Sequence, residues 1–348
     1  MKTLLSTLYK PKLIPHNLKV KEDYESFKLE SLININNPHD KFFKETFGDI
    51  TVAKDFLNHY LPAEILHITD LDTLEPQKDT FIAEHLTENF SDLLFKVNLL
   101  GHPGYFYILF EHKSYPDQNI VRQLLQYMLE IWKTKINKEH NRKIPLVIPL
   151  VIYHGKNSWN APESLDKMIV GYPLFPNDIK NYIPNFEYVL YNLSQFSDEE
   201  INGSYKLKAY LTICRDILTD DNTQFMHSIF RAIDFLLQIE DFETRVSYLQ
   251  VLFLYIFSAG KNLTKKEVNR VLKKIPEGRE IVMTLAELYR KEGEQRGIEK
   301  GIEKGIEKAK LEVVKNSLQI GFSIDDIVRI TGLSKEEIEK VKSELNFK

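Results

Sequence analysis

The sequence predicts an α/β fold in which an antiparallel β-meander is followed by a long helical region. Three observations predict it. Apolar residues recur at helical spacing from Asp40, strand-like segments follow over residues 80–113, and a helical pattern at 120–136 leads into a strand at 144–153. Beyond these elements, residues 193–290 are helical in pattern almost throughout. The length of 348 residues corresponds to about two domains and is enough to bury a sizeable core.

The first predicted elements are an arm and a pair of helices. Residues 1–36 show no clear period and predict an irregular arm that ends at Pro38. We expect Gly48 to divide the helical stretch that starts at Asp40, and Leu61-Pro62 to end it. The apolar positions that define the stretch are Phe42, Phe43, Phe47, Ile50, Phe56 and Leu57.

Three strands are expected next, and the last two form a hairpin. Thr80–Leu86 predicts the first strand, Asp92–Leu100 the second and Tyr105–Lys113 the third. Gly101–Gly104 predicts a four-residue hairpin loop between the last two. The meander therefore brings the start of one strand beside the end of the next.

A further strand, Ile144–Tyr153, is nearly all apolar and rich in β-branched residues. That composition is typical of a strand buried on both faces. Because proline lacks the N–H that a central ladder needs, Pro149 predicts a bulge or a short break within it.

One internal repeat marks the C-terminal third of the chain. Gly297-Ile-Glu-Lys recurs at Gly301 and Gly305. Four residues advance a helix by about 40° beyond a full turn, so the isoleucines form no long straight seam. Each glycine also weakens a helix by about 1 kcal/mol relative to alanine. We predict a solvated, marginally stable helical connector, with short-range self-association as the alternative.

The tail after the repeat predicts three short helices in a helix-turn-helix pattern. Ser323 and Ser334 open two of them with acidic first turns, and Gly332 ends the earlier one. A DNA-reading head is normally basic, but residues 323–348 carry six acids and five bases. The pattern therefore favours a protein-contact or autoregulatory module over a DNA reader, and we expect it to act through a partner or a second copy.

These patterns give five predicted segments. They are an arm at 1–36, an α/β core at 37–195, a helical region at 196–295, a repeat connector at 296–310 and a helix-turn-helix-like tail at 311–348.

Composition restricts the class of protein. With 46 Lys and Arg against 50 Asp and Glu, the net charge is −4, so any nucleic-acid binding must come from a local basic groove. The single cysteine, Cys214, excludes a disulfide or a thiolate metal cluster within the chain, and we expect it to be a small core residue. No stretch approaches the length of a membrane span, and no signal peptide is apparent. We therefore expect a cytoplasmic protein that contacts no membrane.

The chemically informative residues are Asp92, Glu111 and Lys113. Strand alternation places Glu111 and Lys113 on one face, and the hairpin lays the strand of Asp92 antiparallel to theirs. Two carboxylates and an ammonium at one sheet end suit a hard divalent cation. Such an ion polarises a phosphoryl oxygen and lowers the pKa of water, so the arrangement favours phosphodiester hydrolysis with Lys113 as the catalytic cation. Charged residues on the exposed face of a strand are the simpler interpretation.

Other residues complete the hypothetical site. Asp40 or, as an alternative, Glu84 supplies a third carboxylate, although Asp40 also suits the N-cap of the first helix. Gln123 and Tyr127 lie four residues apart, on one face of the helix after the hairpin, and we expect that face to point at the scissile phosphate. A basic strip that can track a DNA backbone comprises Lys133, Lys135, Lys138, Arg142 and Lys143, with a solvated helix end as its alternative.

The order helix, meander, helix and strand, with Asp92 and Glu111-His-Lys113 in place, resembles the PD-(D/E)XK nuclease superfamily. Gln123-Leu-Leu-Gln-Tyr127 is similar to the Gln-xxx-Tyr element of its RecB-like members. The resemblance implies a restriction-endonuclease-like core, with a mixed sheet flanked by helices. It also implies that Asp92 and Glu111 bind the metal and that Lys113 assists attack.

A narrower likeness runs from about residue 38 to the end of the chain. It is carried by His39-Asp40-Lys-Phe-Phe-Lys44, Phe56-Leu57 with Leu61-Pro62, Ser91-Asp92-Leu-Leu, Phe110-Glu-His-Lys-Ser114, Tyr127 with Ile131-Trp132, Pro145-Leu-Val-Ile-Pro149, Val151-Ile-Tyr-His-Gly155, the Gly-Ile-Glu-Lys repeats and Ile330-Thr-Gly-Leu-Ser334. These segments resemble the Rpn family of recombination-promoting nucleases, which are also described as transposases. Many members have Gln in place of Lys113 and Arg in place of Gln123, so this chain departs from the family at both positions.

The resemblance implies a DNA endonuclease of low sequence specificity that depends on Mg²⁺, with Mn²⁺ or Ca²⁺ as alternatives. It further implies double-stranded DNA as the partner and a link to recombination or phage defence. Two alternatives remain open at this point: an inactive nuclease fold that binds DNA or a protein, and a true transposase.

Overall fold

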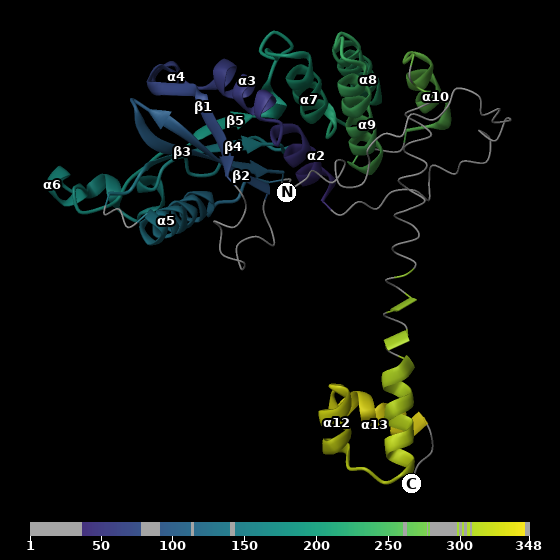
Figure 1. Cartoon of the computed structure of the whole chain (residues 1–348). Helices are drawn as coiled ribbons and strands as arrows, with labels where there is room; N and C mark the ends of the chain where they lie inside the picture. Colours follow the sequence, from purple (N-terminus) through teal and green to yellow (C-terminus); the bar gives the residue numbers. More distant parts are fainter. Residues whose placement is uncertain are drawn as a thin grey trace. The chain divides into compact units, whose positions relative to one another are not determined.

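The chain folds around a five-stranded mixed sheet with helices on both faces (Figure 1). The computed structural model describes residues 37–77, 91–112, 115–139, 143–259, 263–276, 278, 298, 301–302, 305–306 and 308–344. The spatial order of the strands is β1-β2-β3-β4-β5; the first three are antiparallel, and β3, β4 and β5 are parallel. The predicted α/β class is therefore confirmed.

The strands are β1 Thr69–Gln77, β2 Ser91–Leu99, β3 His102–Glu111, β4 Leu146–Tyr153 and β5 Val189–Asn192. The helices of the sheet region are α2 Pro38–Phe47, α3 Ile50–Tyr60, α4 Ala63–Ile68, α5 Ile120–Glu139, η5 Asp166–Met168, η6 Tyr172–Leu174, α6 Asn177–Lys180 and η7 Leu193–Gln195. The later helices are α7 Tyr205–Asp216, α8 Asn222–Leu237, α9 Phe242–Ala259, α10 Lys265–Lys273, α12 Ile324–Thr331 and α13 Lys335–Glu344.

A tight turn and a crossover helix explain the mixed sheet. Leu99 pairs with His102, so the β2–β3 hairpin turns through Leu100 and Gly101 alone, with φ of 49° and 76°. Positive φ at both positions matches the right-handed twist of hairpin strands. The predicted four-residue loop was therefore too long, and His102–Gly104 belongs to β3. The parallel partner β4 is reached through α5, because parallel neighbours require a long crossover connection.

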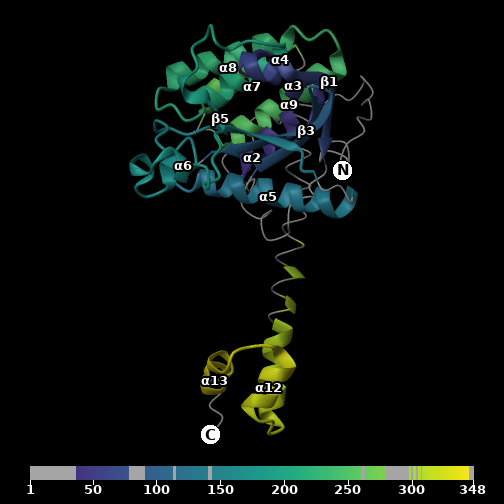
Figure 2. The ribbon, with the colours of Figure 1, turned by 90° about the vertical axis from the view of Figure 1, so that its left-hand side faces the viewer.

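One face of the sheet packs against α5, which Figure 1 shows below the strands, with α3 above them, and which Figure 2 also places below the strands. The side chains that meet there include Tyr105, Tyr107 and Leu109 of β3 with Val121, Leu124 and Met128 of α5. All are buried. The α5 apolar positions recur at three- and four-residue intervals, which is why this stretch forms a one-sided helix.

The opposite face packs against α2 and α3 through aromatic side chains. Phe43 of α2 stacks on Phe110 of β3, with ring centroids 4.7 Å apart and planes inclined by 8°. Phe56 of α3 meets Tyr191 of β5 edge to face at 4.9 Å. The β-strand alternation therefore separates an α5 face from an α2 face, and residues next to each other in β3 serve different cores.

The turn between α2 and α3 is tied to the later helices through Asp49. This N-cap of α3 accepts hydrogen bonds from the Thr51 amide at 2.9 Å, the Tyr248 hydroxyl at 2.7 Å and Lys206 Nζ at 2.9 Å. Burial raises the pKa of its carboxyl, but these hydrogen bonds outweigh burial and lower the pKa to about 2. The ionised carboxylate is thus preferred in the folded protein.

This depressed pKa predicts an acid-sensitive contribution to stability. Because the pKa falls from 3.8 to about 2 on folding, the contribution is present above about pH 4 and disappears toward pH 2. Asp49→Asn is expected to lower the free energy of unfolding at pH 7 by about 1 kcal/mol, after allowance for the partial exposure of the group. Urea unfolding at pH 7, 5, 4 and 3 should show the difference from wild type shrinking below pH 4, whereas the exposed Asp178→Asn should show none. A difference that is constant with pH would contradict the assignment.

The structure corrects several predicted elements. α2 begins at Pro38, so Asp40 is its third residue and not its N-cap; Asn37 holds that position. β1 and the four-residue β5 had no prediction, and the predicted strand 80–86 lies outside the described residues. Pro149 produces no bulge: the β3–β4 register runs through it, and β5 pairs with β4 only from Leu150.

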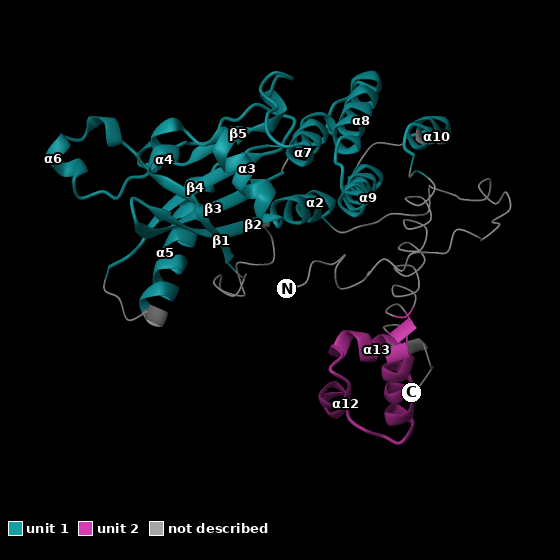
Figure 3. Ribbon diagram, turned by 45° about the horizontal axis from the view of Figure 1, so that its top comes forward, with its two compact units in different colours: residues 1–281 teal, residues 282–348 magenta. Residues whose placement is uncertain are grey.

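The chain divides into two compact units, residues 1–281 and 282–348 (Figure 3). In the second unit, residues 308–319 are helical and pack with α12 and α13 around Val314, Ile327 and Ile338. Ser323 caps α12 by accepting from the Asp326 amide, and Gly332 ends it with φ of 68°. These caps confirm the three helices predicted for the tail.

The Gly-Ile-Glu-Lys repeat is helical where it is described. Ile298, Ile302 and Ile306 are all more than half exposed. The predicted solvated connector agrees with this exposure, while the self-association alternative stays a prediction.

Candidate active site

Asp92 and Glu111 lie on one face of the β2–β3 hairpin, as the sequence predicts. Asp92 pairs with Leu109, so Glu111 is two residues farther along β3 on the same face. Such diagonal neighbours have Cα atoms roughly 7–8 Å apart, within reach of one another's side chains. The face is the one that packs against α5, because Leu109 belongs to that core. Asp92 is 8% exposed and Glu111 2%.

Tyr107 fixes the Asp92 carboxylate. Its hydroxyl donates a hydrogen bond of 2.9 Å to Asp92 Oδ2 in a buried environment. Burial and the nearby charge of Asp92 raise the pKa of Tyr107 well above its ordinary value, so the hydroxyl keeps its proton. Asp92 is therefore held by a permanent donor from the neighbouring strand.

Tyr127 of α5 extends this contact. Its ring stacks on that of Tyr107, with centroids 4.9 Å apart. Burial, followed by the charge of Asp92, raises the pKa of Tyr127 to about 12, and hydrogen bonding with Gln123 and Tyr107 opposes the rise. Of the two α5 residues predicted to face the site, Tyr127 thus stands beside Tyr107, which in turn contacts Asp92, and Gln123 hydrogen-bonds with Tyr127.

Glu111 has a different neighbour on its other side. It pairs with Tyr153 in the parallel β3–β4 ladder. Burial and the charge of Glu111 raise the pKa of Tyr153. Gly155 lies directly over this tyrosine: a Cβ there would come within 2.1 Å of the Tyr153 hydroxyl oxygen. A glycine is needed at this position for the chain to leave β4 across the tyrosine ring.

Asp40 lies against the residue that follows Glu111. One of its carboxylate oxygens, Oδ1, lies 3.1 Å from Nδ1 of His112, and His112 follows Glu111 in the chain. The role of Asp40 as a third metal ligand stays a prediction; in the part of the chain that the structure describes, no three His, Cys, Asp or Glu residues gather as a metal site. Lys113 and the alternative ligand Glu84 lie outside the described residues.

Two buried carboxylates nevertheless suit a divalent cation. Mg²⁺ is typically held by one or two carboxylates and keeps several waters, which substrate phosphate oxygens partly replace. Asp92 and Glu111 supply hard oxygen ligands at the end of a rigid strand pair. The donor set therefore fits Mg²⁺ and does not resemble a thiolate or polyhistidine site.

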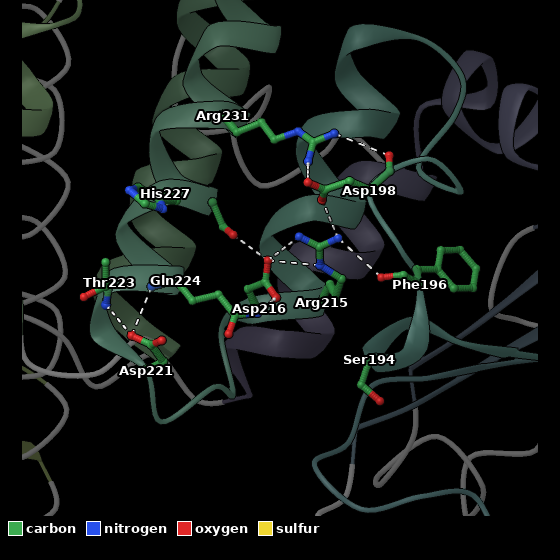
Figure 4. Close-up of a pocket in the computed structure, with 11 residues that line it drawn as sticks. Ser194, Phe196, Asp198, Arg215, Asp216, Asp221, Thr223, Gln224, His227 and Arg231 are labelled. Atoms are coloured by element: carbon green, nitrogen blue, oxygen red, sulfur yellow. Dashed lines mark hydrogen bonds and ion pairs between the residues drawn. The ribbon is translucent and has the colours of Figure 1, made fainter.

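A pocket of about 540 Å³ lies elsewhere, between the 194–198 segment, α7 and α8 (Figure 4). Its charges pair with one another. Asp198 accepts from Arg215 at 2.6 Å and pairs with Arg231. The buried Asp216 accepts from Arg215 at 2.7 Å and from Gln224 at 3.0 Å. This network fastens the 194–198 segment to the two helices and contains neither predicted metal ligand.

Other sequence expectations concern Cys214 and the basic strip. Cys214 is buried, and burial raises the pKa of its thiol to about 12, so it is the unreactive core residue that was expected. In the strip, Lys133 lies 3.5 Å from Glu130 and Lys135 stands 4.9 Å from the centre of the Tyr105 ring. Arg142 lies outside the described residues, and the DNA role of the strip stays a prediction.

Sequence reasoning missed Tyr107. Alternation along β3 places Tyr107 on the face of Glu111, but an aromatic residue at that position is typical of the hydrophobic core. If Asp92 binds a metal ion as the sequence predicts, we expect Tyr107→Phe to lower activity about 10- to 100-fold, because the group that orients this ligand is lost. Plasmid cleavage rates measure this effect. Tyr105→Phe is the matched control, two residues earlier on the same face; an equal loss in both variants would contradict the role of Tyr107.

Comparison with known proteins identifies the family. The profile of a family described as "Putative transposase, YhgA-like" matches residues 37–244. The chain belongs to this family. It is also similar to the recombination-promoting nucleases RpnA and RpnC of Escherichia coli K12, each 28% identical over 87% of this chain and 96% of the relative. The Rpn assignment made from the sequence is thus confirmed.

Not all Rpn relatives are named as active nucleases. A further one from Escherichia coli K12 is the inactive recombination-promoting nuclease-like protein RpnE, 26% identical over 87% of this chain and 97% of its own length. No solved structure matches the chain significantly. In the described part of this Rpn-family chain, no helix is both long and apolar enough to cross a membrane.

Proposed function

We propose that this Rpn-family chain is a metal-dependent DNA endonuclease with a PD-(D/E)XK core. The observation that carries the proposal is the buried pair Asp92 and Glu111, diagonal neighbours at one end of the β2–β3 hairpin. The mixed sheet and the names of the Rpn relatives support it. The substrate is double-stranded DNA, which the protein cleaves with low sequence specificity.

Asp92 and Glu111 hold the metal, which we propose to be Mg²⁺, with Mn²⁺ or Ca²⁺ as alternatives. A divalent ion there supplies Lewis-acid polarisation of the phosphate and a bound water of lowered pKa. The side chains of the protein orient the metal ligands and shield the site. Tyr107 donates a hydrogen bond to Oδ2 of Asp92 and so orients its carboxylate. The surrounding tyrosines and apolar residues exclude bulk water, which strengthens charge interactions in the site.

Lys113, Gln123 and Tyr127 complete the proposed catalytic set. Lys113 stabilises the negative charge that grows on the phosphorus oxygens. Gln123 and Tyr127 of α5 orient the phosphate or the attacking water. Tyr127 cannot act as a base near neutral pH, because its pKa is raised to about 12.

A plasmid assay tests the proposal. Purified full-length protein is incubated with supercoiled plasmid and Mg²⁺, Mn²⁺ or Ca²⁺, and nicked and linear products are quantified. Asp92→Ala is expected to lower the rate about 10³-fold, since a lost metal ligand removes several kcal/mol of transition-state stabilisation. Glu75→Ala, an exposed carboxylate on β1, should cleave like wild type. Cleavage that survives in Asp92→Ala or in excess chelator would overturn the assignment.

Some relatives are named as inactive nuclease-like proteins. These names favour one alternative function, in which a nuclease fold binds DNA or a protein without cleaving it. This alternative predicts DNA binding without cleavage under every metal condition. Transposase activity is separated by adding a labelled linear donor: strand transfer joins the donor to the plasmid, whereas hydrolysis leaves it unjoined.

A further inference from the structure

The first two turns of α2 contact the end of the strand that carries Glu111. Phe110 and His112 flank Glu111 in the chain and point to the opposite face. Phe43 of α2 stacks on Phe110 with centroids 4.7 Å apart. Asp40, three residues earlier and so on the same side of α2, has Oδ1 3.1 Å from Nδ1 of His112. Both neighbours of Glu111 are therefore held by one helix.

The contact between Asp40 and His112 is itself supported. The His112 ring stacks on that of His39, with centroids 5.5 Å apart, and His39 Nδ1 lies 2.8 Å from the Tyr255 hydroxyl of α9. The Asp40 side chain is only 14% exposed. The His112 side chain is 29% exposed, so both members of the contact are more shielded from solvent than a surface ion pair.

The backbone on the other side of Glu111 is fixed as well. The His154 amide donates a hydrogen bond of 2.7 Å to the Glu111 carbonyl oxygen, which continues the β3–β4 ladder past Tyr153. With its carbonyl held by β4 and its two neighbours held by α2, Glu111 retains little freedom except to face α5. A shift at residue 112 would rotate the peptide that joins it to Glu111.

We propose that Asp40 is a positioning residue that acts through His112 to hold Glu111 in its productive orientation. This inference deepens the proposed nuclease function and rests on it. Asp40 does not bind the metal in this scheme; it lies on the α2 face, where it sets the direction of a ligand on the α5 face. The residue thus contributes to the rate without touching substrate or ion.

A double-mutant cycle tests the proposal on full-length protein. Asp40→Ala and His112→Ala are each expected to lower kcat about 10- to 100-fold, as does loss of a group that orients a metal ligand. The double variant should lose no more than about threefold beyond either single variant, because both changes break one contact. Asp40→Asn, which keeps an acceptor, should recover part of the rate. The neighbouring exposed Lys41→Ala is the matched control and should cleave like wild type.

Amide hydrogen exchange gives a readout that does not depend on cleavage. Exchange at residues 109–112 should rise in Asp40→Ala and His112→Ala, and not in Lys41→Ala. Losses in kcat that multiply in the double variant, or unchanged kcat in the single variants, would overturn the proposal. If the wild-type protein does not cleave DNA, the proposed nuclease function is wrong. The exchange data alone then decide whether Asp40 holds the end of β3. No rise in exchange at residues 109–112 would reject that role of Asp40.

Discussion

Glu111→Gln is expected to abolish nearly all cleavage while leaving the protein folded. The amide keeps the size of the carboxylate but loses its charge, so the proposed metal is held by Asp92 alone. Loss of one hard anionic ligand is expected to lower the cleavage rate about 10³-fold, which is about 4 kcal/mol of transition-state stabilisation. The plasmid assay measures the rate, and calorimetric titration with Mn²⁺ measures the lost affinity.

Two comparisons make this result specific. Glu75→Gln changes an exposed glutamate of β1 in the same way and should retain both cleavage and metal binding. Circular dichroism confirms that each variant is folded before assay. Full cleavage by Glu111→Gln at the wild-type metal concentration would show that Glu111 is not a ligand.

Phe43→Ala is expected to cost about 3–5 kcal/mol of folding free energy, the range for truncating a buried aromatic residue. Phe43 is fully buried, stacks on Phe110 and lies 5.0 Å from the Phe47 ring. The truncation opens a cavity between α2 and β3 and removes one of the two α2 contacts that flank Glu111. Urea unfolding followed by tryptophan fluorescence measures the loss.

Tryptophan is a suitable probe because both tryptophans, Trp132 and Trp159, belong to the unit of residues 1–281. The signal thus reports on the sheet-containing unit alone. Phe175→Ala is the control, since this phenylalanine is 39% exposed. It should cost less than about 1 kcal/mol, as surface substitutions do. A loss of that size in Phe43→Ala would contradict the packing described between α2 and β3.

Much of the fold could be predicted because its central elements have strong periodicity. The pair α2 and α3, the hairpin strands, α5 and β4 all follow from apolar spacing, and the tail helices follow from their caps. β1 could not be found this way. It is an edge strand whose leucines, Leu71 and Leu74, lie three positions apart, so the sequence lacks the apolar alternation that marks a half-buried strand, although burial alternates from Thr69 to Thr73. β5 is only four residues long.

The candidate site was predictable where it depends on alternation and not where it depends on packing. The period of two places Asp92 and Glu111 on one face. This period does not show whether the Tyr107 hydroxyl donates a hydrogen bond to Asp92, because a buried tyrosine and a buried phenylalanine give the same apolar pattern along a strand. The contact of Asp40 with His112 was not predictable for a related reason: position near a helix start cannot tell which face of the sheet the residue will meet.

The two-residue turn at Leu100 and Gly101 imposes a rule on how this hairpin can change during evolution. One residue inserted between Asp92 and the turn would carry Asp92 to the α2 face, because side chains alternate strictly along a strand. Two inserted residues would restore it to the face of Glu111. Viable length changes in this hairpin are therefore expected to come in even steps, whatever amino acids they introduce.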